Sequence, residues 1–415
     1  MPDRGTCGES KPGTTMRTLI LSDLHLGGVS RSDLLRRAEL REPLLRAVED
    51  VDRVVLLGDV LELRHGPPRE ALAIARPFFE DLGRALQGRE LVLVAGNHDH
   101  ALIEPWLALR AELSGLEPLG LQQLLEPAEA SPMVRRLADW AAPALVRFAY
   151  PGLWVRPDVY ATHGHYLDCH LTVPTIERLS IGAMSRLLGR PAHGFDEVGD
   201  YESVTAPMYA WRHAIARDAR TSDALNGIAT VHAWRTLGGG RDGDSASRDR
   251  ARSRRSLRAT LAAKLRARAL VHGFPLAVAA LNRAGLGPLR SQISSGELRG
   301  AGLRAMGEVS SRLGLGDAYV VFGHTHRSGP LPGDDDSEWN RPPAPGSGAV
   351  SGPRLVNTGS WTYDSIFLTD TPGESPYWPG NCVLVEDSGA PVLQRLLLDR
   401  TNAELKPARR EPSTA

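Results

Sequence analysis

Short apolar runs that end in glycine or a polar residue recur along the chain. Five of these runs are Thr18–Leu21, Val54–Leu57, Leu91–Val94, Val159–Thr162 and Tyr319–Phe322. Each has the length and the β-branched content of a buried strand. Helical patterns over Ser32–Glu49 and Glu70–Leu86 fill the first two gaps. This alternation predicts an α/β domain whose first strands are largely parallel, with ligands bound at the carboxyl ends of the strands.

Further apolar runs near the end of the chain predict that the core resumes after a large interruption. These closing strands are expected at Arg354–Val356, Cys382–Val385 and Val392–Leu398. Within the interruption, helical patterns cover Thr175–Leu188 and Ser256–Asn282. The predicted segments are a disordered tail (1–15), a first core part (16–165, with a small helical insertion at 101–149), a helical insertion or lid (166–316, with a disordered loop at 238–255), a second core part (317–400) and a polar tail (401–415).

Composition narrows the class of protein. The formal net charge is zero, which does not favour a nucleic-acid-binding protein. The three cysteines, Cys7, Cys169 and Cys382, are far apart and contain no CxxC pair, so we expect free thiols. The N-terminus lacks the apolar segment of a signal peptide, and no run is long enough to span a bilayer. We therefore expect a cytoplasmic protein and leave peripheral contact with a membrane open.

Polar residues that bind metals follow each of the five strands. The sequence there reads DxH, GD, GNHD, HG and GHTH. Each block alone is weak, because GD often marks only a turn and a lone histidine is seldom a ligand. Together, carboxylate, imidazole and amide groups suit Mn²⁺, Fe or Zn²⁺. Asp23 and His25, and likewise His324 and His326, would point to the same side of an extended backbone, which predicts a dinuclear site.

These blocks resemble the calcineurin-like metallophosphoesterases. The matching segments, in order, are Ser22–Gly27, Gly58-Asp59, Gly96–Asp99, His163-Gly164 and Gly323–His326. The resemblance implies a four-layer αββα sandwich, here with a large helical insertion. It also implies two divalent metal ions, with Mn²⁺ preferred. The reaction implied is hydrolysis of a phosphodiester, pyrophosphate or phosphomonoester bond by a hydroxide that bridges the metals.

The resemblance further implies a role for each residue. One metal is expected to bind Asp23, His25, Asp59 and His326. Asp59 would bridge to a second metal, held also by Asn97, His163 and His324. His98 would be the general acid toward the leaving oxygen, and Asp99 would orient His98.

Several nearby residues leave alternatives open. Glu62 fits a second-shell role or a helix cap, and we favour the cap. His165, Asp168 and His170 could line the pocket, but we favour polar loop residues. Within the family, SDLHLG and GDVLEL look most like the UDP-diacylglucosamine hydrolases of lipid A synthesis. That branch typically has GNRD where this chain has GNHD at Gly96–Asp99.

Three functions remain to be compared. The first is hydrolysis of a small-molecule or lipid-headgroup phosphoester, with an insertion that sets substrate choice. The second is a nuclease, which the Arg-rich loop Arg248–Arg258 favours and the zero net charge opposes. The third is a non-catalytic scaffold, although such proteins usually lose ligands and this chain keeps all of them.

Overall fold

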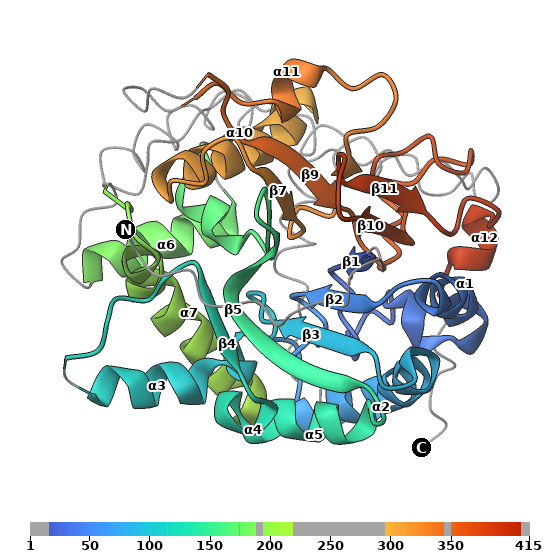
Figure 1. Cartoon of the computed structure of the whole chain (residues 1–415), viewed down its shortest axis with the longest axis horizontal. Helices are drawn as coiled ribbons and strands as arrows, with labels where there is room; N and C mark the ends of the chain where they lie inside the picture. The colour runs from blue at the N-terminus through green and yellow to red at the C-terminus, as the bar shows by residue number, and fades with distance from the viewer. Residues whose placement is uncertain are drawn as a thin grey trace, which may run out of the picture.

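The computed structural model describes residues 16–113, 115–173, 175–187, 194–218, 295–343 and 350–407. It is a mixed α/β fold with a large mixed sheet and flanking helices (Figure 1). The predicted tail 1–15, the loop 238–255, the helical piece Ser256–Asn282 and the segment Arg248–Arg258 lie outside the described residues. Of the predicted free thiols, Cys169 and Cys382 are free and buried, and Cys7 lies outside. Among the described helices, none is long and apolar enough to cross a membrane.

The described strands form one hydrogen-bonded path, β11-β10-β1-β2-β3-β5-β6-β7-β9-β8, with β4 beside β5. Their bounds are β1 (Thr18–Leu21), β2 (Arg53–Leu57), β3 (Glu90–Val94), β4 (Gln122–Leu125), β5 (Leu145–Arg156), β6 (Val159–Thr162), β7 (Tyr319–Phe322), β8 (Ser328–Gly329), β9 (Arg354–Thr358), β10 (Asn381–Val385) and β11 (Val392–Arg395). β1, β2, β3 and β5 pair in parallel, as do β6, β7 and β9. The five strands predicted before metal-binding blocks and the parallel start of the sheet are confirmed.

The described helices are η1 (Leu34–Arg36), α1 (Ala38–Glu49), α2 (Pro68–Leu86), η2 (His100–Leu102), α3 (Glu104–Glu112), α4 (Pro127–Ala130), α5 (Pro132–Trp140), η3 (His165–Cys169), α6 (Ile176–Leu187), α7 (Val198–Asp218), α10 (Ser295–Arg312), α11 (Asp336–Trp339) and α12 (Asn402–Leu405). The two helices predicted between the first three strands are therefore present, and so is the helical piece predicted at Thr175–Leu188.

Strand β5 is an element that the sequence pattern did not predict. Its first half, Leu145–Ala149, falls in the segment expected to be helical, and that expectation is wrong there. This half pairs in parallel with β3, whereas the half after Gly152 pairs antiparallel with β6. A Cβ at Gly152 would lie 2.4 Å from the carbonyl oxygen of Ala161, so the strand needs glycine at this close approach. Long-range pairing on both sides decides the conformation of β5.

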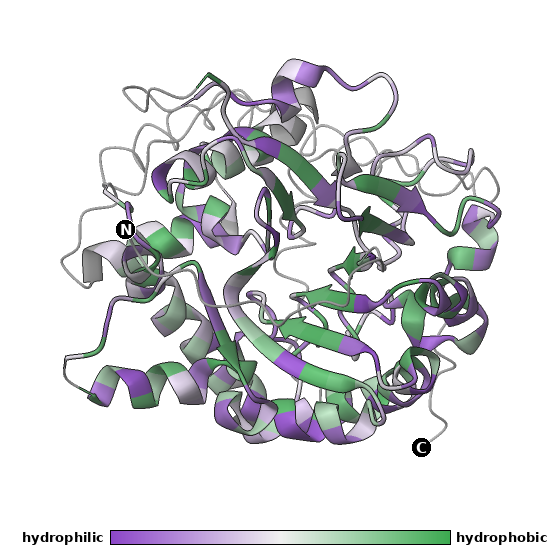
Figure 2. Cartoon of the chain, viewed as in Figure 1, coloured by the Kyte–Doolittle hydropathy of each residue, from purple (hydrophilic) through white to green (hydrophobic). Residues whose placement is uncertain are grey.

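The strands of the sheet are largely hydrophobic (Figure 2), and their alternating side chains enter separate apolar clusters. Leu19 and Leu21 of β1 pack with α1 and α2 in one cluster. Ile20, between them, lies in a second cluster that joins apolar side chains of β1, β2 and β3 to those of β6, β7 and β9. A third cluster joins β6, β7 and β9 to α7 and α10. The period of two along each strand thus assigns successive residues to opposite faces of the sheet.

The buried carboxylate of Glu202 connects helix α7 to the core through hydrogen bonds. Glu202, 8% exposed, accepts a hydrogen bond from the Tyr150 hydroxyl of β5 at 2.5 Å and another from the Tyr166 hydroxyl. Its second oxygen lies 3.4 Å from Nε2 of His100. Burying a carboxylate is costly unless donors surround it, and here three side chains do so. The described part of the predicted insertion therefore packs on the sheet.

We expect Glu202→Ala to lower the free energy of unfolding by about 3 kcal/mol, because it leaves two tyrosine hydroxyls and an imidazole without their acceptor. Urea denaturation followed by circular dichroism measures the loss. The matched control is Glu308→Ala on α10, which removes an exposed carboxylate paired with Arg312 and should change stability by less than about 0.5 kcal/mol. Equal stability of the two variants would contradict the role given to Glu202.

Candidate metal centre

The ends of β1, β2, β3, β6 and β7 bring the predicted ligands together. Among the described residues, three groups have ligand atoms close enough to share an ion: Asp23 with His25 and His326, Asp59 with His163 and His324, and His25 with Glu62 and His98. The first two groups consist of predicted metal ligands. The side chains of Asp23, Asp59 and His163 are almost completely buried. The two parallel sets of strands pack against each other through the middle apolar cluster, and residues more than 300 positions apart in sequence meet at their carboxyl ends.

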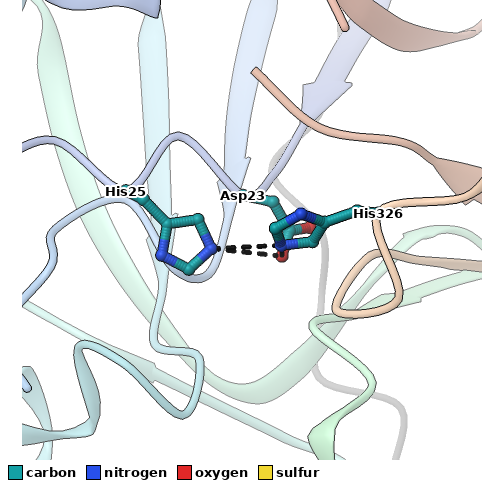
Figure 3. A group of neighbouring side chains, drawn as sticks. All are labelled: Asp23, His25 and His326. Atoms are coloured by element: carbon teal, nitrogen blue, oxygen red, sulfur yellow. Dashed lines mark hydrogen bonds and ion pairs between the residues drawn. The ribbon is translucent and has the colours of Figure 1, made fainter. Parts of the chain in front are cut away.

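In the first group, the side chains of Asp23, His25 and His326 point toward one another (Figure 3). Nε2 of His25 lies 3.2 Å from Nε2 of His326, and Oδ1 of Asp23 lies 3.3 Å from that His326 nitrogen. Oδ1 of Asp23 is buried and makes no hydrogen bond within the described part of the chain. Two ring nitrogens and a carboxylate oxygen directed at one another are a fitting set for a divalent metal.

The second group also places side-chain oxygen atoms close to histidine ring nitrogens. Oδ2 of Asp59 lies 3.3 Å from Nε2 of His163, and Oδ1 of Asn97 lies 3.2 Å from that nitrogen and 3.1 Å from Nδ1 of His324. Without an ion, the reversed amide of Asn97 would make the better hydrogen bonds, because its NH₂ group would then face these nitrogens. An amide oxygen can bind a divalent metal, so Asn97 fits the ligand set of this group when an ion is bound.

Asp59 lies between the two groups. Its Oδ2 is 3.3 Å from His163 in the second group and 3.6 Å from His25 in the first. Burial alone would raise the pKa of Asp59, but the neighbouring His163 and His98 hold it below the ordinary range. Burial likewise disfavours a charged His163, yet Asp59 raises the pKa of His163 to about 9. Without a metal, His163 therefore holds a proton beside the charged Asp59. A metal ion that binds the ring of His163 must displace this proton.

The predicted extended backbone at the two DxH-type pairs is wrong. Five ligands have a positive φ: Asp23 (56°), His25 (46°), Asp59 (52°), His324 (67°) and His326 (59°). This region costs of order 1–3 kcal/mol for residues other than glycine, and such strain gathers at functional sites. Backbone bonds from His25 N to Asp59 O (2.8 Å) and from Asp23 N to Gly58 O (3.1 Å) hold the turn. Gly58 itself has φ +84°, and a Cβ there would lie 2.6 Å from the His163 ring.

His98 is oriented by Glu62 and not, as predicted, by Asp99. Nδ1 of His98 lies 2.7 Å from Oε2 of Glu62, a buried carboxylate that also approaches Nδ1 of His25 at 3.3 Å. The favoured role of Glu62 as a helix cap is also wrong, because α2 begins only at Pro68 and Glu62 points into the site. Its second-shell alternative fits the contacts. Glu62 follows the end of a strand, as many helix-capping residues do. Only its contact with His98 distinguishes the second-shell role from the cap.

Asp99 has a different structural task. Its carboxylate accepts backbone N–H bonds from Gly96 at 2.7 Å, from Val60 at 2.7 Å and from Leu61 at 3.2 Å. These bonds tie the loop after β2 to the loop after β3. Asp99 therefore holds in register the two loops that carry Asp59 and Asn97.

The two nitrogens of His98 face different surroundings. Burial lowers the pKa of His98 to about 4, with Arg64 adding to this effect and Glu62 opposing it. The ionised Glu62 favours the tautomer with its proton on Nδ1, which leaves Nε2 for the cavity. An anionic phosphoryl group beside Nε2 would favour its protonation.

We expect Glu62→Gln to lower kcat by roughly 10–100-fold, because a neutral amide holds the His98 imidazole less firmly in this tautomer. Steady-state kinetics with the metal-loaded protein measures the effect. Adding Glu62→Gln to His98→Ala should then remove little further activity, since Glu62 acts through the imidazole that is already gone. Independent, multiplying losses would show that Glu62 and His98 do not act together.

A cavity of about 200 Å³ lies over the two groups, lined by Asp59, Asn97, His98, Asp168, Thr175, Glu177, His324 and His326. Asp168 is buried, and its Oδ1 lies 3.0 Å from Nε2 of His324. Reading Asp168 as a polar loop residue was therefore wrong, and its position five residues after His163 was the available signal. His165 is also buried, and His170 contacts the Tyr201 hydroxyl at 2.8 Å. Neither of these histidines lines the cavity.

Comparison with known proteins agrees with this geometry. Residues 16–204 match the family model of the calcineurin-like phosphoesterases. A search of curated proteins found no match. Neither result supports the UDP-diacylglucosamine hydrolase branch. The buried groups of His, Asp and Glu are consistent with a dinuclear metal site of unknown metal identity. Residues 16–204 therefore form a calcineurin-like phosphoesterase domain, and the chain is a hydrolase acting on phosphoric ester bonds.

Proposed function

We propose that the chain hydrolyses a phosphodiester, pyrophosphate or phosphomonoester bond with two divalent metal ions. The observation that carries the proposal is the position of Asp59, whose Oδ2 lies 3.3 Å from His163 and 3.6 Å from His25. A carboxylate between two converging ligand groups is the arrangement that a two-metal site needs. The proposed ligand sets are Asp23, His25, Asp59 and His326 for one metal, and Asp59, Asn97, His163 and His324 for the other.

The residues divide the chemistry between them. When bound, the two ions supply activation of water and neutralisation of phosphoryl charge. His98, held by Glu62, presents Nε2 to the cavity and would pass a proton to the leaving oxygen. Asp168 fixes the ring of His324, and Asp99 fixes the loops that carry Asp59 and Asn97. Mixed nitrogen and oxygen ligands suit Mn²⁺, which we propose ahead of Fe and Zn²⁺.

The four-layer αββα arrangement is part of the proposal. It is supported by the middle apolar cluster, which joins two sets of strands, and by the outer clusters, which carry α1 and α2 on one side and α7 and α10 on the other. Such a sandwich holds the loops after β1, β2, β3, β6 and β7 against one another. Rigid elements of this kind keep ligands in place to within a fraction of an ångström.

We propose a small-molecule or lipid-headgroup phosphoester as the substrate. A cavity of about 200 Å³ accepts a phosphoryl group with a small substituent. Thr175 and Glu177 of the predicted insertion line this cavity, which supports a part for the insertion in substrate choice. A nuclease activity and contact with a membrane surface stay predictions, and the Arg-rich segment invoked for the nuclease lies outside the described residues.

The testing experiment is an activity screen on metal-free protein reloaded with Mn²⁺, Fe²⁺ or Zn²⁺. The substrates are chromogenic phosphomonoesters, linear and cyclic diesters, and nucleotide-sugar pyrophosphates. We expect turnover that requires metal and stops when a chelator is added. A protein that binds two equivalents of metal and cleaves none of these substrates would contradict the proposal and favour a scaffold.

A further inference from the structure

We propose that Glu177 and Thr175 form a subsite for a hydroxylated substituent of the phosphoester, such as a glycerol or sugar group. This inference rests on the proposed function, because it concerns the same cavity. Both residues lie at the start of α6 and line the cavity beside His98 and His324. Glu177 adds a carboxylate to a cavity whose substrate is anionic. A carboxylate repels a phosphoryl oxygen, so the part of the substrate that lies beside Glu177 is expected to be a hydrogen-bond donor outside the phosphoryl group.

Two arginines hold Glu177 in place. Nη2 of Arg64, from the loop after β2, lies 3.6 Å from Oε1 of Glu177, and Nη1 of Arg212, from α7, lies 3.5 Å from the same oxygen. The side chains of Arg64 and Arg212 are 9% and 17% exposed. Both arginines approach Oε1, and within the described part of the chain Oε2 can accept a hydrogen bond from a ligand.

Thr175 supplies the complementary donor. Its Oγ1 accepts a hydrogen bond from the backbone N–H of Arg178 at 3.1 Å, which caps α6. The hydroxyl proton of Thr175 therefore remains available to donate. A hydroxyl group on a substrate both donates and accepts, so it can bind Glu177 and Thr175 together. An alkyl substituent would leave the carboxylate and the hydroxyl unpaired.

Charge distinguishes a hydroxyl from an ammonium group. Two guanidinium groups and one carboxylate leave a single net positive charge at Glu177. An ammonium group bound to Glu177 would lie near the guanidinium groups of Arg64 and Arg212, and like charges in a partly buried site repel each other. A neutral hydroxyl avoids this repulsion. The geometry thus favours polyol esters over aminoalkyl esters.

The test uses p-nitrophenyl phosphodiesters that share one leaving group and differ in the second substituent. The three substituents are 2,3-dihydroxypropyl, propyl and 2-aminoethyl. With Mn²⁺-loaded full-length protein, we expect kcat/KM for the dihydroxypropyl ester to exceed that for the propyl ester by roughly 10–100-fold, as for a hydrogen bond to a charged group. The aminoethyl ester should show no such advantage.

Glu177→Ala should bring the ratio of kcat/KM for the dihydroxypropyl ester to that for the propyl ester close to one, since the carboxylate that accepts from the substrate hydroxyl is gone. Thr175→Val should reduce the preference in part. Glu308→Ala, an exposed carboxylate of α10, is the matched control and should keep it. Bound metal is measured in every variant to show that the centre is intact.

Two results overturn the subsite while hydrolysis itself stands. One is equal turnover of the dihydroxypropyl and propyl esters by the unaltered protein. The other is a preference that survives in Glu177→Ala with metal retained. A preference for the aminoethyl ester that Glu177→Ala removes would overturn the assignment to hydroxyl groups. If metal-loaded protein cleaves none of the three esters, the proposed function fails and the subsite falls with it.

Discussion

Replacement of Asp59 by asparagine is expected to abolish hydrolysis and to lower bound metal toward one equivalent or none. Asp59 is the residue whose carboxylate approaches both ligand groups, at 3.6 Å from His25 and 3.3 Å from His163. An amide carries no charge and offers one oxygen, so it cannot bridge two cations as a carboxylate does. Both metals should therefore bind more weakly at once, which no other substitution among the proposed ligands would cause.

Metal analysis of the purified variant, together with turnover of a chromogenic diester, measures both effects. Asp158→Asn is the matched control, because Asp158 is an exposed carboxylate paired with Arg156 between β5 and β6. This control should bind metal and cleave the diester like the unaltered protein. Two firmly bound equivalents in Asp59→Asn would contradict the bridging position of Asp59.

Replacement of His98 by alanine is expected to lower the rate by roughly 10²–10⁴-fold, the range of a general acid, with both metals retained. His98 lines the cavity and is held by Glu62 at 2.7 Å, yet it stands outside both proposed ligand sets. The loss should be smaller for esters with good leaving groups, because a stable anion departs without a proton.

Comparison of nitrophenyl with alkyl esters of the same phosphate tests this dependence. His65→Ala is a close control, because His65 also approaches Glu62, at 3.2 Å, but its side chain is 41% exposed and does not line the cavity. That variant should keep nearly full activity. If His98→Ala slows good and poor leaving groups equally, His98 positions the substrate and does not transfer a proton.

Sequence reasoning succeeded where function depends on residues that follow a strand directly. Each of the seven predicted ligands stands within four residues of the end of β1, β2, β3, β6 or β7, and the structure brings all of them to one place. Within each parallel set, β1 to β3 and β6 to β7, the residues after one strand lie at the same edge as those after its neighbours, and packing of the two sets brings these edges together. Most residues of the candidate centre could therefore be predicted from the local sequence pattern and the order of the strands.

The supporting residues were not predictable in the same way. Glu62 and Asp168 orient His98 and His324, whereas Asp99 binds backbone N–H groups. All three are carboxylates in polar loops, where sequence alone cannot separate a cap from a contact with a catalytic ring. Their roles depend on distances between loops of different strands, which no local pattern encodes.

The sequence by itself determined most of the strands, their parallel start and the set of metal-binding side chains, because apolar period and residue chemistry are local properties. Tertiary structure alone decided the left-handed turns at Asp23 and His25, the central strand β5 and the meeting of Glu177 with Arg64 and Arg212. Each of these features requires contacts between segments that are distant in sequence. Such contacts stabilise a backbone conformation, or a partly buried charged side chain, that the isolated segment would not favour.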